Sequence, residues 1–396
     1  MRVTVVGGTY REECIEPRVN RLWGSGLRAA RLLLALGCDT RLLTWADEQT
    51  ALELESLAAT FGIDVMASVR DKPVRYLYET PVQPAMRDGD ATGDAVAAEG
   101  DIVLGFGLVE ATWSAKATHM VVDPQHSSVT DLLSRVDAAH IALVLNEHEA
   151  RRLGNEDDLS DAANQLLKVG VDVVVIKRGA RGGLVATPDG LHPFGPVPTV
   201  TVDPIGSGDA FTAGFTRAWA VDHTEPVAAA RFGSRVAAAH SLVGAAAFNS
   251  RTLSTVGDPV AFQPVVEACV YLAGPFFSVA QRNLIRVIRR ALQHLGVSVF
   301  SPLHEIGLGG DEVANKDLTG LRSCSSVLAV LDGSDAGTLF ETGWATQAGI
   351  PVVGLAESAD DHAWTMLRGT GSLVVNDLST AIYQAAWAAL DRAGRE

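Results

Sequence analysis

The stretch that most constrains the fold of this chain is a glycine-rich turn that leads into an apolar segment, Asp203–Phe215, reading DPIGSGDAFTAGF. Val200 and Val202 before it predict a β-rich approach, and the apolar residues after it predict a helix from about Ala210. Such a turn presents free backbone N–H groups at the positive end of a helix dipole, where an anion is favoured. The stretch therefore predicts an α/β chain with an anion site at this turn.

Two glycines and one carboxylate give the turn its expected chemistry. Gly206 and Gly208 allow positive φ values and a close approach of the backbone to a ligand. The amides of Ser207, Gly208 and Asp209 would hold a phosphoryl group, while the Asp209 carboxylate takes a proton from an attacking hydroxyl. The alternative is an ordinary glycine turn in which Asp209 is an N-cap.

The longer string resembles the second signature of ribokinase-like (PfkB-type) sugar and nucleoside kinases, D-T-x-G-A-G-D-A-F-x-A-G-F. Pro204 in place of Thr and Ser207 in place of Ala are the differences in its core. The resemblance covers roughly residues 1–250. It implies that ATP and Mg²⁺ are the cofactors and that Asp209 activates a hydroxyl of a small-molecule acceptor, a nucleoside or a sugar.

Two further segments fit this resemblance. Asn146 and Glu149 form an N-x-x-E motif, which in the family organises Mg²⁺ and phosphate; the same pair also has the spacing of a capping box, and the two roles are compatible. The segment VVVIKRGARGG resembles the strand and turn before the nucleotide site. There Lys177, with Arg178, would add charge near the ATP phosphates, and the backbone would pass close to them at Gly179 and Gly182.

The acceptor end of the site departs from the family pattern. Residues Gly24–Gly37 resemble the first signature, where a glycine pair precedes a helix that faces the substrate, but Arg28 aligns with the usual Asn. The Asp that grips the acceptor hydroxyls in the family has no clear counterpart, and Glu12 and Glu13 are the carboxylates near the first strand. The acceptor stays undefined on the sequence.

The rest of the chain alternates between strand and helix patterns, which predicts a parallel sheet with crossover helices. The segment Pro73–Met86, with β-branched and aromatic residues and prolines, predicts edge strands or a small β flap. A polar stretch near 249–268 has no clear period, and a new α/β series starts after it at Val270–Ala273. We therefore expect a ribokinase-like α/β domain followed by a smaller Rossmann-like, doubly wound parallel-sheet domain. The expected divisions are a kinase domain over 1–252, a linker over 253–267 and a second domain over 268–396.

The second series carries YLAGPFF at Tyr271–Phe277 and the long string VLAVLDGSDAGTLFETGWATQAGIPVV at Val327–Val353. Together they resemble the nucleoside 2-deoxyribosyltransferase family and its relatives that hydrolyse nucleoside 5′-monophosphates. This resemblance covers about residues 269–376. It implies attack of a carboxylate on the anomeric carbon of a nucleoside or nucleotide, and cleavage of the N-glycosidic bond.

By position in that motif, Glu341 would be the nucleophile, Asp335 would contact the sugar or assist protonation, and Asp317 would be the acid/base toward the leaving base. Each has a structural alternative. Thr338 and Glu341 have capping-box spacing, and Asp317 could be an N-cap.

A phosphate handle is expected at the start of the first helix of this series. Ser278 and Arg282 follow the first strand there and could bind a 5′-phosphate, although Ser278 could also serve only as an N-cap. The family resemblance implies that Asn376 reaches the site of a neighbouring subunit. The other residues expected to bind the nucleotide are Tyr271, Gly274, Pro275 and Phe276.

Composition limits the partners. The 32 Lys and Arg residues against 47 Asp and Glu residues give a net charge of −15, which disfavours binding to nucleic acid. The four cysteines are scattered, which favours free thiols in a reducing cytoplasm and gives no zinc-type ligand spacing; no direct protein ligand to a metal is indicated. The N-terminal segment lacks the features of a signal peptide, and no apolar run is long enough to span a membrane. Both family resemblances imply a homo-oligomer.

The sequence thus favours a bifunctional enzyme of nucleoside metabolism. ATP-dependent phosphorylation of a nucleoside or sugar hydroxyl would be coupled to N-glycosidic cleavage or transfer of the resulting 5′-monophosphate. One alternative reverses the order, with cleavage first and phosphorylation of the freed sugar second. Another is a kinase regulated by a non-catalytic, nucleotide-binding second domain, and a third is a sugar kinase with an unrelated second domain.

Overall fold

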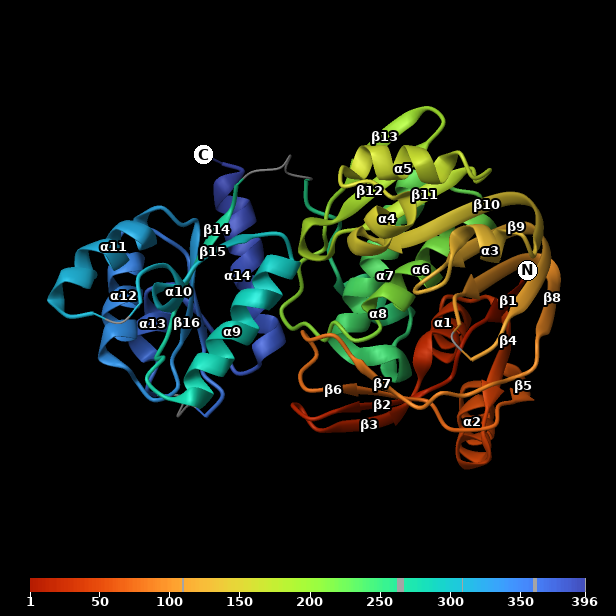
Figure 1. Ribbon diagram of the computed structural model, residues 1–396, viewed down its shortest axis with the longest axis horizontal. Helices are drawn as coiled ribbons and strands as arrows, with labels where there is room; N and C mark the ends of the chain where they lie inside the picture. The colour runs from red at the N-terminus through yellow and green to blue at the C-terminus, as the bar shows by residue number, and fades with distance from the viewer. Residues whose placement is uncertain (109, 262–266, 308, 359–361, 396) are drawn as a thin grey trace. The chain divides into compact units, whose positions relative to one another are not determined.

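The computed structural model describes residues 1–108, 110–261, 267–307, 309–358 and 362–395 (Figure 1). They divide into two compact units. The first unit takes in residues 1–178, 182–199 and 203–261, and the second takes in 179–181, 200–202 and the residues after 261. The predicted linker is only partly irregular, because Ser250–Thr255 forms helix α8 with Asn249 as its N-cap; residues 262–266 of that linker lie outside the described residues. The domain limits at 252 and 268 remain predictions.

Nine described strands of the first unit form one sheet in the order β13-β12-β11-β10-β9-β8-β1-β4-β5. The strands from β5 to β11 are parallel, and β12 and β13 add an antiparallel hairpin at one edge. This arrangement confirms the predicted α/β class. The strand bounds are β1 Arg2–Val6, β4 Asp39–Ala46, β5 Asp64–Val69, β8 Val96–Phe106, β9 Trp113–Asp123, β10 Val136–Asn146, β11 Val173–Lys177, β12 Gly183–Thr187 and β13 Gly190–Phe194.

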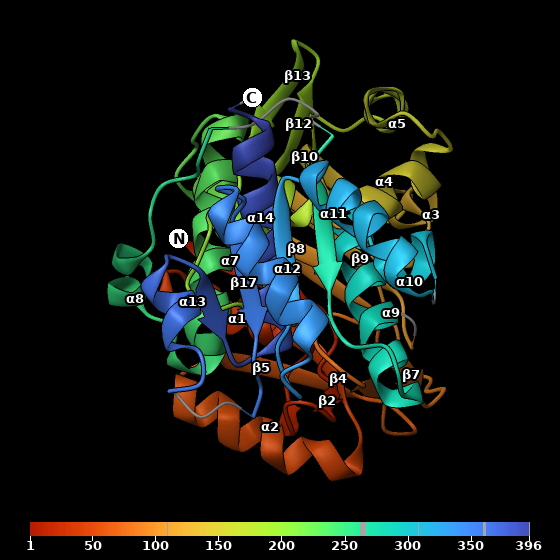
Figure 2. The ribbon, with the colours of Figure 1, turned by 90° about the vertical axis from the view of Figure 1, so that its left-hand side faces the viewer.

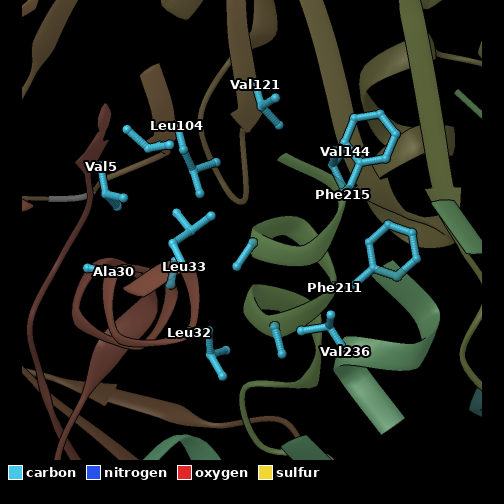
Figure 3. Close-up of a cluster of buried hydrophobic side chains, with 14 of the residues drawn as sticks. Val5, Ala30, Leu32, Leu33, Leu104, Val121, Val144, Phe211, Phe215 and Val236 are labelled. Atoms are coloured by element: carbon cyan, nitrogen blue, oxygen red, sulfur yellow. The ribbon is translucent and has the colours of Figure 1, made fainter. Parts of the chain in front are cut away.

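Helices cover both faces of this sheet. Alternate strand residues point to one face, where the main apolar core also takes in side chains of α1, α2, α6 and α7. Figure 3 shows this core, with strand residues such as Val5, Leu104 and Val121 opposite Leu33 and Phe215. Helices α4 and α5 pack against β10 and β11 on the other face. The helix bounds are α1 Gly24–Ala35, α2 Glu48–Phe61, α3 Val129–Leu133, α4 Glu147–Gly154, α5 Leu159–Leu167, α6 Ser207–Thr216 and α7 Pro226–Ala247.

A second, four-stranded sheet of the first unit has the order β3-β2-β6-β7. Strands β6 (Arg75–Tyr78) and β7 (Met86–Asp88) form the flap expected around Pro73–Met86, and the hairpin of β2 (Arg11–Cys14) and β3 (Val19–Leu22) completes it. Side chains alternate along β2, so Glu12 is buried while Glu13 points to the opposite, more exposed face.

The segment before the glycine-rich turn is not a strand, and the prediction of a β-rich approach at Val200 and Val202 was wrong. Prolines 196, 198 and 204 lack the N–H groups that a ladder needs, and Val200 is 78% exposed. β-propensity alone does not form a strand where no neighbouring strand pairs with it. Helix α6 also begins earlier than predicted, at Ser207.

The second unit has a five-stranded, entirely parallel sheet in the order β15-β14-β16-β17-β18. Helices α9 and α14 contact one face, and α11 and α12 supply core residues on the other (Figure 2). The chain turns from β15 back past β14 to β16, so the doubly wound fold has its topological switch point between β14 and β16, where ligands bind in such sheets. The bounds are β14 Cys269–Ala273, α9 Val279–His294, β15 Ser298–Phe300, α10 Pro302–Glu305, α11 Ala314–Arg322, β16 Ser326–Val330, α12 Ala336–Gln347, β17 Val352–Leu355, α13 Thr365–Gly369, β18 Leu373–Val375 and α14 Leu378–Ala393.

All four cysteines are free thiols, as expected from their spacing. Among the helices of the described residues, none combines the length and the apolar character that crossing a membrane requires.

The core of the first unit should be sensitive to loss of an aromatic ring at Phe215. This side chain is fully buried and stacks on Trp219 at 5.8 Å between ring centroids. Phe215→Ala should lower the free energy of unfolding of this unit by about 3–5 kcal/mol, because it removes buried apolar area and leaves a cavity. Urea denaturation measures the change. Leu52→Ala, at a residue 77% exposed on α2, is the control and should change it by less than about 0.5 kcal/mol. Equal effects of the two substitutions would contradict the packing described.

Candidate active sites

The glycine-rich turn presents two free amides at the start of α6. Gly206 is the N-cap residue, with φ of +78°, and no side chain caps the helix. The amide of Ser207 donates a hydrogen bond to the carbonyl of Pro204 at 3.1 Å. The three-amide site expected from the sequence therefore narrows to the N–H groups of Gly208 and Asp209, which have no partner in the described part of the chain. These N–H groups and the helix dipole favour an anion at this point.

Asp209 lies in the first turn of α6 with 16% of its side chain exposed. Arg28 of α1 donates a hydrogen bond from Nη1 to its Oδ2 at 2.6 Å. Burial raises the pKa of Asp209 to about 6, the Arg28 charge opposes that rise, and the charge of Asp123 adds to it. A carboxyl with a pKa of about 6 is largely ionised at neutral pH and remains basic enough to accept a proton.

Arg28 also forms an ion pair with Glu12 of β2, through the guanidinium nitrogen that does not contact Asp209. Arg28 Nη2 donates to both carboxylate oxygens of Glu12 at 2.6 Å, and only 2% of the Arg28 side chain is exposed. The Gly24 amide also donates to Glu12, at 3.2 Å, and Arg21 Nε does so at 3.3 Å. Glu12 is therefore engaged by protein groups, and Glu13 lies on the other face of β2.

A second ion pair, between a half-buried lysine and a buried aspartate, lies beside the turn. Lys177, at the end of β11, donates to Asp123 Oδ2 at 2.9 Å, and Thr212 of α6 donates to the same oxygen at 3.1 Å. Lys177 Nζ is 3.5 Å from the position that a Cβ on Gly208 would take. The predicted place of Lys177 next to the anion turn thus agrees with the geometry, and its role toward ATP remains a prediction.

Sequence reasoning missed Asp123 and Thr212. Asp123 ends the buried strand β9, and in parallel sheets the carboxyl ends of strands carry ligand sites, so its position was the available signal. Burial lowers the pKa of Lys177, but the charges of Asp123 and Glu149 outweigh burial and hold that pKa above its usual value.

The predicted capping box of α4 is present. Asn146 accepts from the Glu149 amide at 2.8 Å, and Glu149 accepts from the Asn146 amide at 2.8 Å. Burial, together with the charge of Asp123, raises the pKa of Glu149 to about 7. A bound cation would relieve this repulsion between carboxylates, so the capping role leaves a metal role open. Among the described residues no group of three or more His, Cys, Asp or Glu side chains could hold a metal ion.

The turn between β11 and β12 carries the other residues expected near ATP. Gly179 and Gly182 have φ of +54° and +76°, and a Cβ on Gly182 would lie 2.2 Å from the Phe194 carbonyl oxygen. Local backbone geometry thus accounts for glycine at 182. The Arg178 guanidinium pairs with Glu147 at 3.2 Å, so its charge is already engaged.

In the second unit, the carboxylate of Glu341 on α12 accepts a hydrogen bond from Tyr271 Oη of β14 at 2.6 Å. Burial raises the pKa of Glu341 to about 7; the Tyr271 hydrogen bond opposes the rise, and the charges of Asp317 and Asp335 add to it. The structure therefore brings the three predicted carboxylates into electrostatic contact beside the switch point between β14 and β16.

Two structural alternatives for these carboxylates were wrong. The N-cap of α12 is Asp335, which accepts from the Thr338 amide and hydroxyl, both at 2.8 Å, so Thr338 is already inside the helix and forms no capping box with Glu341. Asp317 lies inside α11, whose N-cap is Val313. Its Oδ1 is buried and lacks a hydrogen-bond partner in the described ranges, and burial raises the pKa of this carboxyl. Such an oxygen is available to a ligand.

The predicted phosphate handle has a structural role in this structure. Ser278 is the N-cap of α9 and accepts from the Gln281 amide at 3.2 Å. Arg282 Nη1 donates to the carbonyls of Phe276 and Phe277 at 3.0 and 3.2 Å, which fixes the loop after Gly274 and Pro275. Asn376 is exposed and lies between β18 and α14. Phosphate binding by Ser278 and Arg282 and the role of Asn376 remain predictions.

Comparison with known families decides the class of both units. Residues 103–252 match the model of the pfkB family of carbohydrate kinases. Residues 270–386 match that of nucleoside 2-deoxyribosyltransferases. This chain joins regions of two enzyme families. Both resemblances drawn from the sequence are confirmed, and the units are called the pfkB-type unit and the deoxyribosyltransferase-type unit below.

Relatives of the pfkB-type unit include several named kinases. ATP-dependent 6-phosphofructokinase isozyme 2 of Mycobacterium tuberculosis is 27% identical over 284 residues, which is 62% of this chain and 82% of the relative. Cytidine kinase of Thermococcus kodakarensis is 40% identical over 89 residues, 22% of this chain and 31% of the relative. Among solved structures, ribokinase from Thermotoga maritima aligns with a TM-score of 0.47 at 16% identity, covering 64% of this chain and 97% of that protein.

The hydrogen bond from Tyr271 should set the ionisation of Glu341. Tyr271→Phe removes a donor that favours the charged carboxylate, so the pKa of Glu341 should rise above about 7. The carboxyl is then protonated over more of the neutral range. Carbon-13 NMR titration of the Glu341 side chain measures the change, and Tyr383→Phe on α14, where no hydrogen bond reaches Glu341, is the matched control. An unchanged or lower pKa in Tyr271→Phe would show that the hydrogen bond does not stabilise the carboxylate.

Proposed function

We propose that this protein is a bifunctional nucleoside enzyme. The pfkB-type unit phosphorylates the 5′-hydroxyl of a nucleoside with ATP, and the deoxyribosyltransferase-type unit cleaves the N-glycosidic bond of the resulting monophosphate. One observation carries the proposal: each unit holds a half-buried carboxylate at a parallel-sheet site, Asp209 beside free amides and Glu341 beside Tyr271, and their pKa values are about 6 and about 7.

In the pfkB-type unit, Asp209 accepts the proton of the acceptor hydroxyl. The hydroxyl oxygen then attacks the γ-phosphorus of ATP, and the bond to the β-phosphate oxygen breaks. The free amides of Gly208 and Asp209 stabilise the transferring phosphoryl group, and Lys177 adds a positive charge next to them.

The carboxylates Asp123 and Glu149 fit a bound Mg²⁺. They are oxygen donors that repel one another, and a small number of carboxylates together with nucleotide phosphates is the usual environment of this ion. When bound, Mg²⁺ would neutralise charge that develops on the phosphates. The roles of the protein groups stay as described: Asp123 orients Lys177 and Thr212 through its Oδ2.

In the deoxyribosyltransferase-type unit, Glu341 attacks the anomeric carbon and the bond to the base breaks. Tyr271 holds the carboxylate in place through its 2.6 Å hydrogen bond. Asp317, whose pKa is raised by burial, supplies a proton to the leaving base, and water or a second base then releases the sugar from Glu341.

The order with the kinase first is supported by the partial similarity to a relative named cytidine kinase. The reverse order, in which cleavage comes first and the free sugar is phosphorylated, remains the second candidate. The relative named 6-phosphofructokinase, whose name indicates a sugar phosphate, favours a sugar acceptor.

Carboxamide substitutions separate the two activities. Asp209→Asn should reduce ATP-dependent phosphorylation by at least about a hundredfold, because the general base is lost. Glu341→Gln should abolish base release while ADP formation continues. Both products are followed by chromatography over a panel of nucleosides and sugars with ATP and Mg²⁺.

The matched controls are Asp222→Asn in the first unit and Glu305→Gln in the second, both in ion pairs outside the two sites. Under the proposal, Asp209→Asn also stops base release from a nucleoside. Base release that persists in Asp209→Asn would contradict the kinase-first order. No base release from any nucleoside or monophosphate, with ligand-dependent kinase rates, would instead show a sensor.

A further inference from the structure

A chain of buried charges runs from the flap to the turn that starts α6. Glu12 of β2, Arg28 of α1 and Asp209 of α6 form it, and we refer to these three residues as the ion triad. Their side chains are 7%, 2% and 16% exposed, so little water reaches the charges. The three residues come from elements far apart in the sequence, and so the triad exists only when the flap and both helices are in place.

The hydrogen bonds of the triad give Arg28 one orientation. Its Nη2 is fixed by both oxygens of Glu12, and Glu12 in turn accepts from the Gly24 amide at the first residue of α1. Its Nη1 points the other way, to Oδ2 of Asp209 at 2.6 Å. The planar guanidinium allows these two contacts in a fixed geometry that a lysine ammonium cannot reproduce.

The turn leaves room for this guanidinium only because residue 206 is glycine. A Cβ on Gly206 would lie 2.1 Å from Arg28 Nε and 2.3 Å from Cζ. The Arg28 side chain therefore packs directly against the backbone of the turn whose amides would hold the phosphoryl group.

We propose that Arg28 is a positioning residue for phosphoryl transfer: anchored by Glu12, it binds Oδ2 of Asp209 and leaves Oδ1 to accept the proton of the acceptor hydroxyl. Oδ1 of Asp209 has no hydrogen-bond partner within the described residues, so this oxygen is available to accept the proton while Oδ2 binds Arg28. The inference rests on the proposed kinase function and adds to it how the base is oriented and kept ionised. The Asn that usually occupies this position in ribokinase-like kinases cannot supply the charge.

The other groups around Asp209 do not replace Arg28. Lys177 is bound to Asp123, and His240 near Arg28 has its pKa lowered to about 3 by burial, so it is neutral. Tyr76 and Tyr78 of the flap have pKa values raised by burial and are neutral as well. The charged and titratable groups that face the triad from its neighbouring elements are Arg21, Tyr76, Tyr78, Asp123, Lys177, Asp203 and His240.

The sign of the effect follows from these charges. Arg28 lowers the pKa of Asp209 and Glu12 raises it. Without Arg28, burial prevails, so Asp209 binds its proton at higher pH and the acidic limb of kcat/KM moves to higher pH. Without the charge of Glu12, Arg28 has Asp209 as its remaining charged partner, and the limb moves to lower pH.

The test compares pH profiles of ATP-dependent phosphorylation for the wild type, Arg28→Gln, Arg28→Lys and Glu12→Gln, using the best acceptor of the panel. Arg28→Gln should shift the acidic limb of kcat/KM to higher pH by at least about one unit. At acidic pH this variant should then be at least about tenfold less active than the wild type. Arg28→Lys should keep the limb near its wild-type position with a lower kcat, and Glu12→Gln should shift it downward. Arg31→Gln, one turn along α1 and bonded to the carbonyls of Ala246 and Phe248, should leave the profile unchanged.

Carbon-13 NMR titration of the Asp209 carboxyl gives a second readout that needs no turnover. The pKa of Asp209 should rise in Arg28→Gln and fall in Glu12→Gln. A general loss of stability would not shift this pKa in opposite directions. If Arg28→Gln does not fold, the comparison of Arg28→Lys with Glu12→Gln still decides. If the wild type phosphorylates no acceptor, the proposed function is wrong, but the role of Arg28 can still be tested by NMR. If neither the pKa of Asp209 nor the acidic limb changes in the Arg28 and Glu12 variants, the role of Arg28 is wrong.

Discussion

The ion pair between Arg28 and Asp209 is the interaction on which the pfkB-type site depends. A carboxylate that is removed from water becomes harder to ionise, and burial raises the pKa of Asp209 to about 6 although the charge of Arg28 opposes that rise. The Arg28 guanidinium, 2.6 Å from Asp209 Oδ2, opposes this effect, and Glu12, which accepts a hydrogen bond from the Gly24 amide, keeps Arg28 in place. The four-stranded sheet is thereby linked to Asp209, since Glu12 belongs to β2 rather than to the main sheet.

Each unit has a half-buried carboxylate whose raised pKa is opposed by a neighbouring group, and the neighbouring group differs between the units. In both, a carboxylate lies near the carboxyl end of a parallel sheet, half-buried and with a raised pKa. The cation Arg28 opposes the rise in the pKa of Asp209, whereas a hydrogen bond from the neutral Tyr271 opposes that of Glu341, which has further carboxylates nearby. The difference fits the roles proposed above, because a cation keeps a base ionised and a tyrosine hydroxyl orients a nucleophile without neutralising its charge.

The sequence predicted the parts of the site that depend on short-range pattern. The α/β class, the glycine turn that leads into α6 at Gly206 and the capping box of Asn146 and Glu149 follow from residue type and spacing along a few positions. What it missed depends on pairing across the chain. Asp123 becomes part of the site because β9 and β11 both end at the same edge of the sheet, on either side of β10. The strand expected at Val200 and Val202 does not form because no neighbouring strand pairs with it. The capping box expected at Thr338 is absent because the N-cap of α12 is Asp335, three residues before Thr338, and the helix already begins at Ala336. The contact of Arg28 with Asp209 spans 181 positions, which no local pattern can report.

The most direct test of the account separates the substrate of cleavage from the substrate of phosphorylation. The wild-type protein is incubated without ATP, in parallel, with a panel of nucleosides and with their 5′-monophosphates, and free base is measured by chromatography. The account predicts base and sugar 5-phosphate from at least one monophosphate and no base from the corresponding nucleoside. Release of base from the unphosphorylated nucleoside at an equal or higher rate would contradict it.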